Sequence, residues 1–188
     1  MNTSATAPDI GFAESIGAVD EVLGGWRDVI GKDYAGYRNH VCRVVHYCFA
    51  LRDCSEEDRH KVIIAACFHD LGIWSANTSN YLPPSEALAG DYLRQRGIEH
   101  WIQEIELMID RHHKLRTYRD GRYPLVEVLR EADLVDVSLG IQKFGLPGAY
   151  VRDVKRQFPN AGFHWRLVKL LGQGLRRRPW NPLPIFKW

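Results

Sequence analysis

The strongest constraint on the fold is the spacing of apolar residues, which recur at intervals of three and four along most of the chain. This period matches one face of an α-helix. No stretch of useful length alternates between apolar and polar residues, as a half-buried strand would. The pattern therefore predicts an all-α fold, built as a single-domain helical bundle.

Capping and breaking residues predict where the helices begin and end. We expect helices at about 12–30, 34–51, 56–70, 85–97, 99–112, 124–139, 147–158 and 161–175. Ser55 and Ser85 are the predicted N-caps of two of them. Gly72 is the predicted left-handed cap of a helix that carries His69-Asp70, and the following stretch, 73–84, is predicted to be a loop over the functional site.

The length of 188 residues fits one domain. We expect a flexible leader at 1–11, a domain at 12–175 and a basic, aromatic tail at 176–188. The tail could bind a partner or a neighbouring subunit, and the simpler expectation is that its aromatic residues fold back onto the domain.

Composition excludes several classes of protein. Hydrophobic residues make up 45% and charged residues 26% of the chain, which is typical of a soluble globular protein. The net charge of +2 gives no strong nucleic-acid signal. The chain has neither a signal-peptide pattern nor a stretch long enough to span a bilayer. We therefore expect a cytoplasmic protein without a membrane partner. Its four cysteines are expected to be reduced and to pack as small apolar residues. A homo-oligomer is compatible with the sequence.

Four residues that can bind metal lie on or at the end of predicted helices. They are His40, the adjacent pair His69-Asp70, and Asp133. Burying an imidazole or a carboxylate on a mostly apolar helix is costly unless the group is paired or bound to a metal. Two imidazoles and two carboxylates together make a good site for a divalent cation.

These positions resemble the H…HD…D signature of the HD-domain superfamily, and the Arg43-Val44 pair after the first histidine also fits that pattern. The resemblance covers about residues 37–138. It implies an HD-type bundle in which His40, His69, Asp70 and Asp133 converge on one metal, and it implies metal-dependent phosphohydrolase activity.

The donor types limit the choice of metal. Imidazole nitrogen and carboxylate oxygen suit Mn, Fe, Ni, Co or Zn, whereas Mg prefers oxygen ligands alone. We expect one cation per chain. A water bound to such a cation becomes an effective nucleophile near neutral pH, so hydrolysis is the natural reaction.

A second informative stretch runs from Arg111 to Arg116 and contains His112 and His113. Members of the family often carry histidines here that bind a second metal or contact substrate phosphate; the alternative is a solvated basic helix end. Asp70, His113, Lys114 and Arg43 are the candidate catalytic residues. Arg43 is expected to stabilise developing charge or to pair with Asp133 or Asp136.

Two positions depart from the family pattern. Many of these phosphohydrolases place a lysine or glutamate three residues after the metal-binding aspartate, where this chain has Ile73. Another histidine usually lies near the start of the next helix, where Glu86 stands and could replace it as a ligand.

The expected function is hydrolysis of a small phosphoester, including a nucleotide, with Trp74 and Tyr81 enclosing its organic part. One alternative is a hydratase or di-iron oxygenase with a small non-phosphate substrate. Another is a regulatory module that binds metal without turnover.

Overall fold

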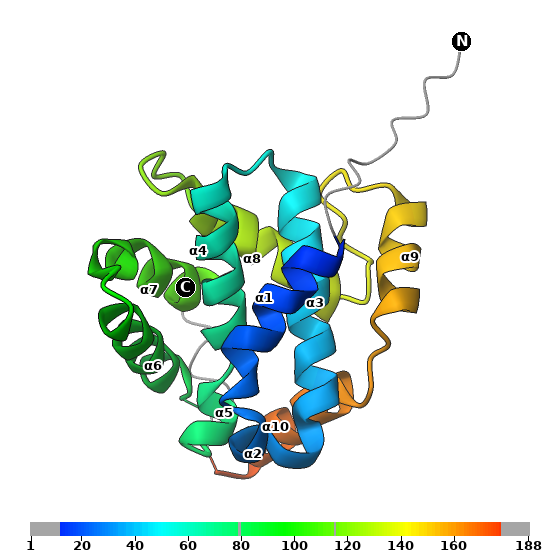
Figure 1. Ribbon diagram of the computed structural model, residues 1–188. Helices are drawn as coiled ribbons and strands as arrows, with labels where there is room; N and C mark the ends of the chain where they lie inside the picture. The colour runs from blue at the N-terminus through cyan, green and yellow to red at the C-terminus, as the bar shows by residue number, and fades with distance from the viewer. Residues whose placement is uncertain (1–11, 79, 115, 178–188) are drawn as a thin grey trace.

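The computed structural model describes residues 12–78, 80–114 and 116–177, and in these residues helices are joined by turns and short loops (Figure 1). The predicted all-α, single-domain bundle is confirmed. The predicted leader and residues 178–188 of the predicted tail lie outside the described residues. The helices are α1 (Phe12–Gly24), α2 (Arg27–Ile30), η1 (Gly31–Asp33), α3 (Tyr34–Leu51), α4 (Glu56–Phe68), α5 (Gly72–Ser75), α6 (Leu82–Gln95), η2 (Glu99–Trp101), α7 (Ile102–Arg111), α8 (Pro124–Val137), α9 (Gly148–Gln157) and α10 (Phe163–Arg177), where η marks a short 3-10 helix.

The helices α3, α4 and α8 form the centre of the bundle. Both α4 and α8 pack against α3, and α1 crosses α3 and α4 on the face toward the viewer (Figure 1). The pair α6 and α7 lies on one side and α9 on the other, while α2, α5 and α10 gather at one end. The predicted metal-binding residues all belong to the three central helices or to the turn after α4.

The core lies between these central helices. Tyr37, Val41, Val44 and Cys48 of α3 are fully buried at the expected helical spacing. The Tyr37 hydroxyl donates a hydrogen bond to the Cys67 carbonyl at 2.8 Å, which ties α3 to α4. All four cysteines are buried and form no disulfide in the structure.

Several helix boundaries differ from the sequence prediction, and α5 occupies the start of the stretch 73–84 that was predicted to be a loop. The predicted helix over 12–30 is interrupted after Gly24, where consecutive glycines lower helix propensity. The helix α6 begins at Leu82 rather than after Ser85, because proline is tolerated in a first turn and Pro83-Pro84 occupy it. The helix α10 continues to Arg177, so it contains the first residues of the predicted tail.

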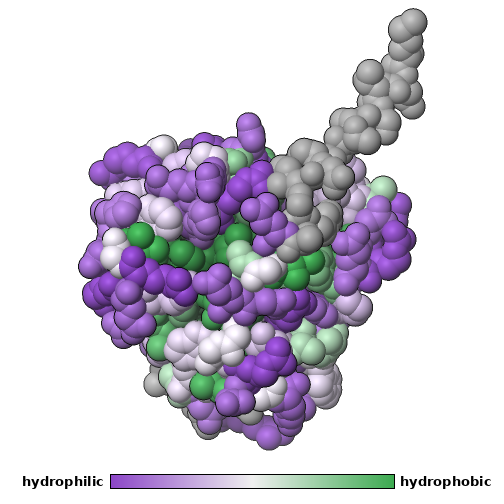
Figure 2. All heavy atoms as spheres, viewed as in Figure 1, coloured by the Kyte–Doolittle hydropathy of each residue, from purple (hydrophilic) through white to green (hydrophobic). Residues whose placement is uncertain are grey.

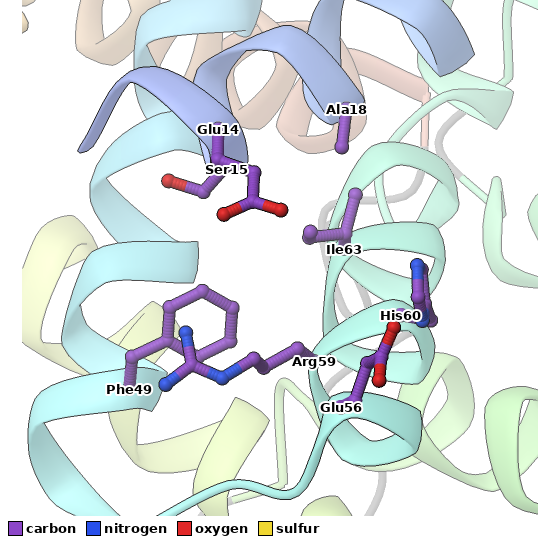
Figure 3. Close-up of a pocket in the computed structure, with 8 residues that line it drawn as sticks. All are labelled: Glu14, Ser15, Ala18, Phe49, Glu56, Arg59, His60 and Ile63. Carbon is purple, nitrogen blue, oxygen red and sulfur yellow. The ribbon is translucent and has the colours of Figure 1, made fainter. Parts of the chain in front are cut away.

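The surface over α1 and α4 has apolar side chains bordered by hydrophilic ones (Figure 2). A pocket of about 390 Å³ lies there, lined by residues of α1, α3 and α4 that include Glu14, Phe49 and Arg59 (Figure 3). Phe49 is nine residues beyond His40 on α3, which places it about 13 Å further along the helix axis. This pocket is therefore distinct from the predicted metal site. No helix in the described ranges is both long and apolar enough to cross a membrane.

Candidate metal centre

The four predicted ligands come together in the structure. His40 on α3 places its Nε2 atom 3.0 Å from Nε2 of His69, which follows α4, and 3.5 Å from Oδ1 of Asp133 on α8. Nε2 of His69 is also 3.5 Å from Oδ2 of Asp70. All four side chains are buried. The convergence joins three segments that are far apart in the sequence.

His112 and His113, which follow α7, complete the cluster on its other side. Nε2 of His112 lies 3.4 Å from Oδ1 of Asp70, and Nε2 of His113 lies 3.7 Å from the same atom. Nδ1 of His113 is 3.8 Å from Oδ2 of Asp133. The two carboxylates thus lie close to all four imidazoles, and the His69 and His112 rings are 4.8 Å apart between centroids.

Within the described residues, three overlapping groups of these side chains have donor atoms close enough to share a metal ion. They are His40, His69 and Asp133; His69, Asp70 and His112; and His112, His113 and Asp133. Buried His and Asp side chains here could therefore hold a metal ion, in one position or in two adjacent ones.

Backbone and carboxylate acceptors fix the tautomers of three histidines. Nδ1 of His69 donates to the Ala66 carbonyl at 2.7 Å, and Nδ1 of His112 donates to the Ile109 carbonyl at 2.6 Å. Nδ1 of His40 donates to Oδ2 of Asp136 at 2.7 Å. Because a neutral imidazole carries only one ring proton, each Nε2 atom then directs a lone pair into the cluster.

The resulting arrangement brings several electron-pair donors together at its centre. The Nε2 lone pairs of His40 and His69 face each other, and Asp70 Oδ1, Asp133 Oδ1 and His112 Nε2 have no hydrogen-bond partner among the residues that the structure describes. An unpartnered buried polar atom costs about 1–3 kcal/mol. A divalent cation would accept all these lone pairs, so the residues present fit a metal.

The electrostatics of the cluster follow from its burial. Burial lowers the pKa values of His40, His69 and His112 to about 4, which keeps the imidazoles neutral and able to coordinate. Burial and the nearby Asp70 carboxylate raise the pKa of Asp133 well above its usual range. Two such carboxylates repel each other without a cation between them.

Arg43 is occupied inside the protein. Its Nε and Nη2 atoms donate to Oδ1 and Oδ2 of Asp136 at 2.5 and 2.8 Å, and Nη1 donates to the Phe158 carbonyl at 2.8 Å. Of the two roles expected for Arg43, the structure shows the pairing with Asp136. The guanidinium is almost fully buried and engaged, so the expected role in stabilising substrate charge is not supported by its placement.

Asp136 is the site residue for which sequence reasoning assigned no function of its own. It orients His40 through the Nδ1 hydrogen bond and is held by Arg43. It follows Asp133 by three residues and therefore lies on the same face of α8. The spacing of three residues from Asp133 was the sequence signal that Asp136 lies near the site. It does not identify His40 as the hydrogen-bond partner of Asp136.

Aromatic side chains enclose the ligands. The Phe163 ring of α10 stacks on the His40 ring with centroids 3.9 Å apart. The hydroxyl of buried Tyr81 is hydrogen-bonded to Nε2 of His113. Trp74 contacts Tyr37 at 4.6 Å between centroids, and its Nε1 donates to Asp33 at 3.1 Å. Phe163 carried no site signal in the sequence because its stacking depends on where α10 packs.

The turn that carries His69 and Asp70 is held by close backbone packing, which corrects the expected role of Gly72. Gly72 is the first residue of α5 and has no positive φ, so it is not a left-handed cap. A Cβ atom there would lie 2.2 Å from the Tyr81 carbonyl oxygen. Ser85 is likewise not an N-cap: it is buried within α6, and its Oγ accepts a hydrogen bond from the Gly72 amide at 2.9 Å.

Two other candidates lie at the edge of the centre or away from it. Lys114 is half-buried beside His113, and its carbonyl accepts a hydrogen bond from Arg130 at 3.3 Å. Burial, together with Asp110 and Glu106 on α7, raises the pKa of Glu86 to about 7. Glu86 therefore faces α7, and it belongs to none of the groups that could share a metal.

The chain matches no protein-family model, no curated protein and no solved structure.

Proposed function

We propose that the protein is a metal-dependent hydrolase that cleaves a small phosphoester, with nucleotides among the candidate substrates. The observation that carries this proposal is the convergence of the Nε2 lone pairs of His40, His69 and His112 on two buried carboxylates. A buried site of this composition is costly without a cation and well suited to one with it.

His40, His69, Asp70 and Asp133 would hold one cation of Mn, Fe, Ni, Co or Zn, because both imidazole and carboxylate donors are present. When bound, such a cation supplies Lewis acidity and lowers the pKa of a coordinated water toward neutrality. The protein contributes fixed ligand orientation through Ala66 and Asp136, which accept the Nδ1 protons of His69 and His40.

The remaining catalytic roles fall to residues on the His112 side of the cluster. His113 is the most exposed member, with 11% of its side chain accessible, and it is hydrogen-bonded to Tyr81. Burial lowers the pKa of His113, so its imidazole is neutral near pH 7 and would accept a proton from the attacking water. Lys114, next in sequence and half-buried, is the nearest candidate cation for the phosphate group.

A second candidate is the expected hydratase or oxygenase, with an uncharged substrate at the same centre. Two observations favour it: the Arg43 guanidinium is already engaged by Asp136, and buried Ile73 offers no charge. Both remove a contact that a phosphate would use. The non-catalytic alternative predicts metal binding without turnover.

The test combines elemental analysis of protein purified without chelators with a phosphatase screen in added Mn, Ni, Co, Fe or Zn. We expect about one cation per chain and phosphate release. The Asp70→Ala variant should lose both, whereas Asp110→Ala, at a half-buried carboxylate of α7, should retain both. Metal without phosphate release would refute the phosphohydrolase, and turnover of an uncharged substrate would then separate the second candidate from the non-catalytic alternative. Full metal occupancy in Asp70→Ala would refute the ligand assignment.

The number of metals needs its own variant. His112→Ala should leave the cation of His40, His69, Asp70 and Asp133 in place if only one is bound. A loss of half the metal in His112→Ala would instead assign a second cation to His112 and His113. His60→Ala on α4, at an exposed histidine, serves as the control.

A further inference from the structure

The helix α10 has apolar residues on two sides. Phe163 and Leu170 face the protein and are 2% and 6% exposed. On another side, four large apolar side chains lie in water, with Trp165 62% and Val168 55% exposed. This outer α10 face consists of Trp165, Val168, Leu171 and Leu175.

The outer α10 face is continuous rather than scattered. Its residues follow one another at spacings of three, three and four, which places them on one side of the helix for more than two turns. Single exposed apolar residues are ordinary, but a stripe of this length indicates an interaction surface.

The charge beside this face has one sign only. From Ala161 to Trp188 the sequence contains no Asp or Glu, and its Lys and Arg residues are Arg166, Lys169, Arg176, Arg177, Arg178 and Lys187. Lys169 and Arg176 are exposed on α10, and the Lys169 ammonium lies 5.6 Å from the centre of the Trp165 ring. Arg166 is partly engaged by Asp33 at 3.4 Å. The occupant of the outer α10 face should therefore be anionic.

This charge also argues against pairing with a second copy. Two α10 helices brought face to face would bring their basic residues, including Lys169 and Arg176, into one interface with no carboxylate on either helix to offset them. A basic amphipathic helix with tryptophan at its apolar edge is instead typical of a segment that lies in the headgroup layer of a membrane.

We infer that the outer α10 face docks on an anionic lipid surface. Trp165, Val168, Leu171 and Leu175 would enter the boundary between headgroups and acyl chains, and Lys169 and Arg176 would meet the lipid phosphates. Such docking needs no spanning helix, so it is compatible with the absence of a membrane-spanning helix among the described residues. It differs from the expectation, based on the sequence, of no membrane partner. The inner side of the same helix stacks Phe163 on His40, which places the candidate centre directly beneath the docked helix.

Sedimentation of the whole chain with vesicles tests this inference. We expect binding to vesicles of phosphatidylcholine and phosphatidylglycerol, weak binding to phosphatidylcholine alone, and release by added salt. The substitution Val168→Asp should weaken binding at least about tenfold, since it places a charge in the apolar boundary. The double substitution Lys169→Glu/Arg176→Glu should also weaken it at least about tenfold.

Two controls match these variants. Ile141→Asp places the same charge at an apolar residue that is 82% exposed elsewhere, and Arg152→Glu/Arg156→Glu makes the same change in net charge on α9. Both should bind vesicles like the parent chain. Equal binding by Val168→Asp and the parent, or no binding to anionic vesicles, would overturn the inference. A dimer that Val168→Asp dissociates, without vesicle binding, would also overturn it and assign the face to a second copy.

Discussion

Arg43 and Asp136, which are 93 residues apart in the sequence, form a buried pair with two hydrogen bonds, Nε to Oδ1 at 2.5 Å and Nη2 to Oδ2 at 2.8 Å. The same Oδ2 atom accepts the Nδ1 proton of His40 at 2.7 Å. Burial would raise the pKa of Asp136, but these hydrogen bonds from His40 and Arg43 outweigh it and hold that pKa well below its usual range. The charged carboxylate therefore fixes a candidate metal ligand in one orientation.

Replacing Asp136 should weaken metal binding without removing any ligand. In Asp136→Asn, the neutral amide no longer matches Arg43 and polarises His40 less, so metal affinity should fall about 10- to 100-fold. Competition with a chromophoric chelator measures this affinity. Asp153→Asn, at an exposed aspartate that pairs with Arg156 on α9, is the control and should bind metal normally. Unchanged affinity in Asp136→Asn would show that His40 needs no such support.

Removing Arg43 should destabilise the fold because it leaves the Asp136 charge buried without its partner. We expect Arg43→Met to lower the free energy of unfolding by about 3–5 kcal/mol, measured by urea denaturation with a chelator present. The double variant Arg43→Met/Asp136→Leu should recover part of this loss, since the unpaired charge is gone. Arg156→Met, which breaks an exposed pair, should change stability by no more than about 1 kcal/mol. Additive effects of the two core substitutions would contradict the pairing.

Local signals in the sequence were sufficient for much of the fold. The helix α3 runs from Tyr34 to Leu51 as predicted, because its apolar spacing is uninterrupted. The predicted cap at Ser55 is present as a capping box with Asp58. Prediction was wrong where tertiary packing decides: Ser85 resembles a cap, but its hydroxyl binds the Gly72 amide.

The candidate centre was predictable in its ligand types and less so in its contacts. His40, His69, Asp70 and Asp133 stand out because polar groups on apolar helices need a reason to be buried. The roles of their neighbours depend on which helices meet. Nothing in the sequence indicates that Arg43 pairs with Asp136 rather than with Asp133. The positions of Phe163 and Tyr81 depend on packing between distant segments.

Acid should destabilise the protein partly through His46, which is buried outside the candidate centre. Burial lowers the pKa of His46 from 6.5 to about 4. The imidazole is therefore neutral in the folded chain, whereas the unfolded chain takes up a proton below pH 6.5, so stability falls as the pH drops from about 6.5 toward 4. Between about pH 7 and 5, the variant His46→Gln should lose about 2 kcal/mol less than the parent.

The measurement is urea denaturation across this pH range with a chelator present. Because the chelator removes any metal, the histidines of the candidate centre titrate in the same way in the parent and in His46→Gln. His60→Gln, at an exposed histidine of α4, should follow the parent profile. Parallel profiles for the parent and His46→Gln would mean that the pKa of His46 is the same in the folded and unfolded chains, contrary to this prediction.

A methyl group at Gly72 should disturb both the fold and the metal site, since the added Cβ would lie 2.2 Å from the Tyr81 carbonyl oxygen and 3.0 Å from Ser85 Oγ. Backbone cannot yield as a flexible side chain does, so Gly72→Ala should cost about 1–3 kcal/mol of stability. Because the displaced Tyr81 is hydrogen-bonded to His113, and Asp70 precedes Gly72 by two residues, metal affinity should fall as well.

Gly90→Ala is the matched control. Gly90 lies within α6, where a Cβ atom would meet only the guanidinium end of Arg94, at 3.4 Å. That side chain can move, and alanine favours a helix over glycine by about 1 kcal/mol, so Gly90→Ala should be neutral or stabilising. The two substitutions are chemically identical, but only Gly72→Ala should lower the temperature of thermal unfolding. A stable Gly72→Ala variant with normal metal affinity would mean that the contact between α5 and the Tyr81 carbonyl does not position the His69-Asp70 turn.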